Sequence, residues 1–296
     1  AELGLFTRAA AQMLRANVVM YQQDASRYAT VLTDMREIIG SGLYSLRSDF
    51  AGLWTDSGEW GTESIFEINY TDSPSSRTWE NPTKAGGTVF PTLIGINGYS
   101  GPEWDTGGYG FEPVEEALYN AYEGDDTRRD ATILNFAKYR QQHPEATYTP
   151  RYDDTGYFNR KYLGRADGHD KYTGNAPEMN FRNNYRVWRY AETLLIASEL
   201  IVRTNGDRDE ADDYLNQVRA RAFGMKPGDT AFAAKRRTAT LDNLLLENRL
   251  EFALEGHRFW DLVRYGKAEE VLGSRGYTDA KKPLPIPQSE IDQAHG

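Results

Sequence analysis

Residues 247–264 read ENRLEFALEGHRFWDLVR, a helical pattern that is dense in charge. Glu247, Glu251 and Glu255 recur every four residues and therefore share one face of a helix. Three arginines lie near them in the sequence: Arg249, Arg258 and Arg264. Two such carboxylates could be the acid and base of a glycosidase. We predict instead that they form an ionic network holding helices and loops, because such networks also occur where there is no chemistry.

Helical patterns continue on the N-terminal side of this stretch. Apolar residues recur with a period near 3.6 in several segments, and polar turns separate them. The predicted helices cover residues 5–21, 24–39, 185–203, 209–222 and 240–265. The first four form two pairs of helix, polar turn and helix, in the manner of degenerate tetratricopeptide repeats. The two pairs begin about 180 residues apart, so they do not form a simple tandem array.

The middle of the chain, residues 43–184, has a different composition. Residues 86–110 contain eight glycines and two prolines, which is typical of a long loop. Short strands are predicted near residues 64–70 and 157–163, and helix is predicted over 113–139 with a break at 123–126. We therefore expect a mainly α fold that carries a large irregular insertion and a few short strands.

Large aromatic side chains are concentrated in this insertion. Residues 77–162 hold 15 of them in 86 positions, a density that argues against disorder. An exposed indole or phenol can stack on the apolar face of a sugar while polar neighbours bind its hydroxyls, and glycines let backbone approach a ligand. The candidate ligand-binding residues are Trp79, Trp104, Tyr99, Tyr109 and Phe111. The alternative for each is that it packs the loop onto the helices.

Composition excludes several other functions. The chain has 296 residues, a net charge of −10 and no cysteine, which argues against nucleic-acid binding and rules out thiolate sites. The four histidines are far apart, and we predict no metal site, no cofactor and no catalytic residue. Acidic pairs at 125–126 and 153–154 could help to hold calcium, but a solvated turn is the favoured interpretation. No nucleotide-binding or nucleophile-elbow motif is present.

Six stretches, taken in order, resemble the SusD/RagB family of outer-membrane nutrient-binding lipoproteins. The stronger four are RYAETLL at 189–195, YLNQVRARA at 214–222, residues 247–264, and PIPQSEID at 285–292. The weaker two are DTRRD at 126–130 and GYFNRKY at 156–162. The resemblance extends over essentially the whole chain. It implies one domain of residues 1–296, with a helical pair at 1–42, a ligand-facing insertion at 43–184 and a C-terminal helical region at 185–296.

The resemblance also implies a function. Family members are surface-exposed lipoproteins of the outer membrane that bind an oligosaccharide and pass it to a TonB-dependent transporter of the SusC type. The lipidated cysteine and an earlier helical region would then lie upstream of Ala1, and the family's usual ending would continue past Ile291. Binding without catalysis is expected.

Three alternatives stay open at the level of sequence. The first is a peptide-binding protein of the RagB kind on the same scaffold. The second is a glycoside hydrolase, which would need two carboxylates facing one pocket. The third is a helical-repeat adaptor for protein partners, which would be favoured if the aromatic residues of the loop were wholly buried.

Overall fold

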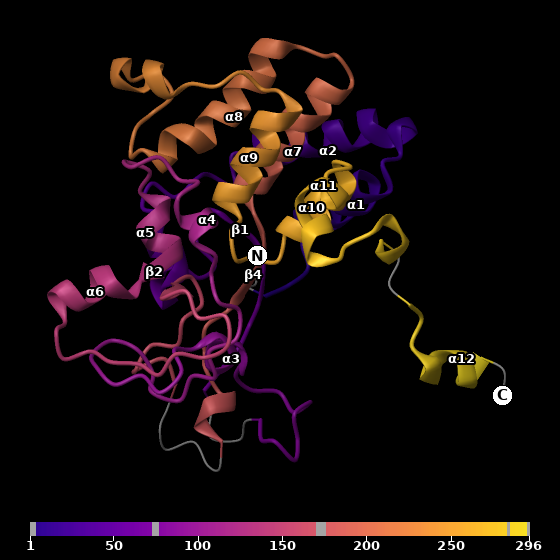
Figure 1. The fold of residues 1–296 in the computed structure, drawn as a ribbon. Helices are drawn as coiled ribbons and strands as arrows, with labels where there is room; N and C mark the ends of the chain where they lie inside the picture. The colour runs from indigo at the N-terminus through magenta and orange to yellow at the C-terminus, as the bar shows by residue number, and fades with distance from the viewer. Residues whose placement is uncertain (1–3, 73–76, 170–175, 283–284, 295–296) are drawn as a thin grey trace.

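The computed structural model describes residues 4–72, 77–169, 176–282 and 285–294. Figure 1 shows long helices at one end of the molecule and a loop-rich region at the other. The helices are α1 (Arg8–Gln22), α2 (Tyr28–Gly40), α3 (Phe90–Ile94), α4 (Glu116–Tyr119), α5 (Arg128–Thr132), α6 (Phe136–Gln142), α7 (Tyr190–Arg203), α8 (Arg208–Ala222), α9 (Leu241–Glu251), α10 (Arg258–Arg264), α11 (Ala268–Leu272) and α12 (Gln288–Ala294). The strands are β1 (Ser64–Ile68), β2 (Ile133–Asn135), β3 (Tyr157–Asn159) and β4 (Tyr185–Arg189). The predicted mainly α fold with a few short strands is confirmed.

The two predicted helical pairs pack directly against each other. Helices α1 and α2 form one pair, α7 and α8 form the other, and α2 packs on α7, which gives the row α1–α2–α7–α8. The apolar faces of these helices form the largest core, with Met13, Met35 and Leu194 fully buried. Side-chain caps fix the N-termini of α1 and α8, since Thr7 accepts from the third amide of α1 and Asp207 accepts from the second and third amides of α8. Within the described residues, none of the helices has the length and apolarity needed to span a membrane.

The base of the insertion is a two-stranded antiparallel ribbon. Strand β1 pairs with β4, and Ser64 lies opposite Arg189. The prediction of helix from residue 185 was wrong for the first five residues, which form β4 before α7 begins at Tyr190. The sequence YRVWR alternates large side chains and suits a strand, and its pairing partner lies about 120 residues earlier, where a local pattern cannot reveal it.

The long helix predicted over 240–265 is two helices joined at a corner. Helix α9 ends at Glu251, and α10 begins at Arg258. Leu254 and Gly256 adopt left-handed backbone conformations, with φ of 66° and 85°. The corner is held from outside, because the Tyr185 hydroxyl donates to the carbonyl of Glu255 at 2.9 Å. A long-range contact therefore overrides the helical pattern here.

The helix predicted over 113–139 is also interrupted. It is replaced by α4, α5, strand β2 and α6, and β2 pairs with β3 in an antiparallel ribbon. Strand β3 covers only the first three residues of the predicted strand at 157–163. In the tail, the prolines at 283, 285 and 287 predict an extended segment, because each fixes φ, but Pro283 and Leu284 lie outside the described residues.

A buried ionic network joins the insertion to the helices. It contains five basic and five acidic side chains, none more than 4% exposed, so that its charges balance. The basic members are Arg128, Lys161, Arg189, Arg219 and Arg221, and the acidic members are Glu63, Asp126, Glu247, Glu251 and Glu255. Arg128 and Lys161 come from the insertion and bind glutamates of α9 and its corner. We call this set the ionic clamp.

In the ionic clamp, attraction between opposite charges opposes the effect of burial on the pKa values of Glu251 and Lys161. Burial opposes ionisation of Glu251, but attraction from Arg221, Arg189 and Arg128 outweighs it and holds the pKa of this carboxyl well below its usual range. Burial lowers the pKa of Lys161 to about 8, against the attraction of Glu255 at 2.6 Å. Removing one member would therefore leave buried partners uncompensated.

The predicted ionic network exists, but its arginines are different ones. Arg264 pairs instead with Glu199 of α7, at 2.6 Å. Within the described residues, neither Arg249 nor Arg258 has an ion-pair partner or a side-chain hydrogen bond. The true partners of Glu247, Glu251 and Glu255 lie 28 to 123 residues away, which a helical pattern cannot indicate.

Candidate functional site

Three of the five candidate aromatic residues lie at the surface around the short helix α3. The side chains of Trp79 and Phe111 are each 50% exposed, and Tyr109 is half-buried. We call Trp79, Tyr109 and Phe111 the aromatic surface. Exposed rings of this size, held by polar neighbours, are suited to stacking on the flat apolar faces of sugar rings.

Helix α3 positions two of these rings through its backbone carbonyls. The amide of Tyr109 donates to the carbonyl of Thr92 at 2.8 Å, and that of Phe111 donates to Leu93 at 2.9 Å. The two aromatic rings meet edge to face at 6.1 Å. The loop that carries Tyr109 and Phe111 runs close to the end of α3. Gly108 makes this possible, because a Cβ there would lie 2.2 Å from the backbone of Gly95. This glycine serves close backbone packing within the loop.

Trp79 reaches the same region from another loop. Its indole Nε1 donates to the Glu178 carboxylate at 2.7 Å, and the carbonyl of Glu178 accepts from the Thr92 hydroxyl of α3. The loop that carries Trp79 is anchored by Asn180, whose side chain is 1% exposed. Its amide oxygen accepts from the amides of Arg77 and Gly87, and its nitrogen donates to the carbonyl of Arg77. The Trp79 ring is therefore held in place before any ligand arrives.

Two residues beside the aromatic surface add charge. The Arg151 guanidinium lies over the Phe111 ring, 5.4 Å from its centroid, and donates to the carbonyl of Tyr109. Glu178 supplies the carboxylate beside Trp79. Sequence analysis did not single out Arg151, Glu178 or Asn180. Their partners are 42 to 103 residues away, and no local motif marks them.

The other two candidates, Trp104 and Tyr99, are corrected by the structure. They are 2% and 3% exposed and belong to a second core cluster inside the insertion. Trp104 has Arg160 and Arg165 against its ring, at 5.8 and 5.4 Å from the centroid. The Tyr99 hydroxyl donates to the carbonyl of Pro102, and burial raises its pKa above the usual value. Neither ring presents a face for stacking, so both stabilise the loop.

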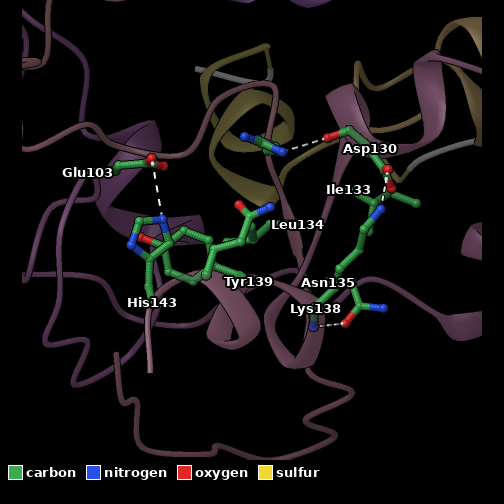
Figure 2. A pocket seen from close by; sticks show the side chains of 10 residues that line it. Glu103, Asp130, Ile133, Leu134, Asn135, Lys138, Tyr139 and His143 are labelled. Carbon is green, nitrogen blue, oxygen red and sulfur yellow. Dashed lines mark hydrogen bonds and ion pairs between the residues drawn. The ribbon is translucent and has the colours of Figure 1, made fainter. Parts of the chain in front are cut away.

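A polar pocket of about 210 Å³ lies beside this second core. Figure 2 shows Glu103 and His143 on one side of it and Asp130 and Lys138 on the other. Asp130 is paired with Lys138 at 2.5 Å, and His143 lies 3.8 Å from Glu103. Burial raises the pKa of Asp130, but Lys138 outweighs this and holds it below its usual value. Asp130 is thus an ionised, paired group and is unsuited to act as a general acid.

The structure gives no metal site in the part of the chain that it describes. No group of three or more histidine, aspartate or glutamate side chains there could hold an ion. Of the two acidic pairs noted in the sequence, Asp125 binds Lys235, Asp126 joins the ionic clamp and Asp154 accepts from Tyr148.

The fold is a helical-repeat scaffold, and its insertion carries the exposed or half-buried rings of Trp79, Tyr109 and Phe111. A model of the SusD family matches residues 62–283, three quarters of the chain. The chain therefore belongs to the SusD family. Among curated relatives, the SusD-like proteins P25 and P2 of Formosa agariphila are 24% and 27% identical over 98% and 83% of the chain. The chain spans 57% and 49% of their lengths.

Solved structures agree more closely. Surface glycan-binding protein A from Bacteroides thetaiotaomicron, in complex with laminarihexaose, is 42% identical, with a TM-score of 0.85 over 99% of this chain and 63% of that one. The protein of the same name from Bacteroides fluxus is 39% identical, with a TM-score of 0.84 over 98% of this chain and 60% of that one. A laminarin-binding SusD-like protein is 32% identical, with a TM-score of 0.83 over 98% and 61%.

Proposed function

We propose that this protein binds a glycan of the laminarin type on the aromatic surface formed by Trp79, Tyr109 and Phe111. The observation that carries the proposal is the placement of these rings around α3, with Trp79 held by Glu178 and Phe111 covered on one side by Arg151. Rings stack on the sugar faces, and the adjacent carboxylate and guanidinium take the hydroxyls. The 42% identity to a protein solved with laminarihexaose supports this ligand class.

The proposed role is capture without catalysis. The pocket beside Trp104 contains two carboxylates, but Asp130 is paired with Lys138, and the glutamates of the ionic clamp are bound to arginines and lysine. A glycosidase needs one carboxylic acid that keeps its proton near neutral pH. We further propose that the protein works at the outer-membrane surface and passes its ligand to a SusC-type transporter, as its family membership suggests.

Calorimetric titration with laminarihexaose tests the binding site. The double variant Trp79→Ala, Phe111→Ala should bind at least tenfold more weakly, which corresponds to about 1.4 kcal/mol. Trp260→Ala is the matched control, because this tryptophan is 43% exposed but lies on α10. If the double variant bound as tightly as wild type, or if the control lost as much affinity, the assignment of the surface would be wrong.

Two further measurements address the alternatives. A mixture of oligopeptides in the same titration separates a peptide binder from a glycan binder, and tighter peptide binding would overturn the glycan proposal. Release of reducing sugar from laminarin at high protein concentration would reveal an enzyme. Co-purification of the full-length protein with a SusC-type transporter from outer membranes tests the proposed partner, and its absence from the isolated complex would count against transfer.

A further inference from the structure

A second cavity lies at the corner between α9 and α10. Its volume is about 430 Å³, and its walls come from α4, the α9–α10 corner and α11. Figure 1 places α10 and α11 at a clear distance from α3. Most of the lining is apolar, and the side chains that matter here are Leu118, Leu254, Phe259, Leu262 and Val271.

Two half-buried arginines, Arg249 and Arg258, line this cavity. In the part of the chain that the structure describes, no carboxylate lies within ion-pairing distance of either guanidinium, and neither makes a side-chain hydrogen bond. They also repel each other. Burial and the charge of Arg249 together lower the pKa of Arg258. A half-buried cation without a partner lowers the stability of the fold. The chain has a net charge of −10, so acidic side chains outnumber basic ones, yet none pairs with these two arginines among the described residues.

The acidic groups nearest to the cavity are already engaged elsewhere. The charge of Asp261 attracts Arg258, but this carboxylate is paired with Arg264 at 2.8 Å. Glu115 is paired with Arg275 at the rim. Burial raises the pKa of Glu112, and only the Asn159 amide opposes this, so that the arginines do not stabilise its charge. The positive charge of the pair is therefore left for a group from outside.

We propose that this cavity binds a carboxylate flanked by aliphatic groups on a polypeptide partner, with the carboxylate on Arg249 and Arg258 and the aliphatic groups against Leu254 and Phe259. Guanidinium groups bind carboxylates through paired hydrogen bonds, which are strong where water is partly excluded. An acidic sugar fits less well, because its hydroxyls would face apolar walls and lose their hydrogen bonds. None of the three rings of the aromatic surface lines this cavity.

The test is a titration of the isotope-labelled protein, followed by NMR, with acetyl-Leu-Asp-Leu-amide. The peptide should shift signals of cavity residues such as Leu118 and Val271. The isosteric acetyl-Leu-Asn-Leu-amide should bind at least tenfold more weakly, and glucuronate should not bind in the cavity. Equal binding of the Asp and Asn peptides, or tighter binding of glucuronate, would overturn the proposal. This comparison needs no variant.

Variants then assign the binding to the two arginines. Arg249→Gln and Arg258→Gln should each weaken the Asp peptide by about tenfold, while their melting temperatures stay at or above that of wild type because a like-charge repulsion is removed. Arg208→Gln on α8 is the matched control, since Arg208 is exposed and outside the cavity. An equal loss in the Arg208 variant, or no loss in the other two, would contradict the assignment. Trp79→Ala should leave peptide binding unchanged.

Discussion

The ionic clamp joins the insertion to the helices, the aromatic surface lies on the insertion alone, and the two differ in whether their side chains are buried and paired or exposed. At the base, every charge of the clamp is buried and paired, and five cations meet five anions. At the far end, Trp79 and Phe111 are half exposed, and Glu178 and Arg151 hold them from one side. The ionic clamp fixes the position of the insertion, whereas the rings of the aromatic surface remain at least partly exposed to solvent.

The same contrast between buried, paired groups and exposed or unpaired groups is found elsewhere in the molecule. Satisfied groups in this protein mark architecture, even when they are carboxylates in numbers that suggest catalysis. Exposure, and not hydrogen bonding, separates Trp79 from Trp104, because their side chains are 50% and 2% exposed. Pairing separates Glu251, which binds three arginines, from Arg258, which lies seven residues further on and has no ion-pair partner among the described residues.

The largest expected effect comes from removing the centre of the clamp. Glu251→Ala leaves Arg128, Arg189 and Arg221 without their shared carboxylate, and it should lower the free energy of unfolding toward the upper end of about 3–5 kcal/mol. Urea unfolding measures this loss. Glu270→Ala is the control, because Glu270 makes an exposed pair with Lys267 and should leave the urea midpoint unchanged. A clamp variant as stable as the control would show that the paired base is not structural.

Trp104→Ala should cost about 3 kcal/mol of unfolding free energy, because it empties a large site in the second core. Thermal and urea unfolding measure it, with Trp79→Ala as the exposed counterpart that should stay within about 0.5 kcal/mol of wild type. If Trp104→Ala retained stability but lost glycan binding, the division between buried and exposed aromatic residues would be broken.

Glu192 is a buried carboxylate that, unlike the glutamates of the ionic clamp, has no cation paired with it in the described structure. It is buried, one oxygen accepts from Asn17, and the other has no partner in the described structure. Burial raises its pKa, so the folded state holds the proton more tightly than the unfolded state does. The stabilising contribution is therefore complete below about pH 4.5 and is lost as the pH rises through the raised pKa of the folded protein.

Glu192→Gln should accordingly raise the free energy of unfolding at pH 7 by about 1 kcal/mol. The gain should vanish near pH 4, where wild-type Glu192 is protonated. Urea unfolding at the two pH values is the measurement. A gain of equal size at both would mean that Glu192 has the same pKa in the folded and the unfolded protein, which would contradict the raised pKa.

The smallest effect sharpens the description of the aromatic surface. Trp79→Phe keeps a ring but loses the hydrogen bond to Glu178, so the ring is held less firmly. Affinity for laminarihexaose should fall only about threefold, or roughly 0.7 kcal/mol. Calorimetry checks this, and Glu178→Gln should give a loss of similar size. A loss as large as that of Trp79→Ala would mean that the hydrogen bond, and not the ring, dominates.

Much of the helical fold could be predicted from the sequence, and the reason is local. Helices α1, α2, α7 and α8 follow the apolar spacing, and the polar turns between them are recognisable. The α9–α10 corner could not be predicted, because Tyr185 and Lys161 bind its carbonyls from distant segments. Strand β4 was hidden for the same reason.

The site was predictable only in part. The glycine-rich stretch at 86–110 directed attention to the aromatic residues in and beside it. Of these, Trp79, Tyr109 and Phe111 lie at the surface. The burial of Trp104 and Tyr99 depends on neighbours up to 61 residues away, such as Arg165, so their sequence context did not distinguish them from Trp79. The network of glutamates was expected, but the identity of its arginines required the fold.

The ribbon of β1 and β4 has a consequence for how such proteins diversify. Because Ile68 lies opposite Tyr185, the two ends of the intervening segment are joined whatever its contents. Lengthening a loop whose ends are already closed costs little, about 0.6 kcal/mol for each doubling. The segment can therefore exchange its ligand-facing residues with little effect on the helical row, provided that Arg128 and Lys161 keep their places. Under the proposed function, a segment transplanted from a relative should bring the sugar preference of that relative with it.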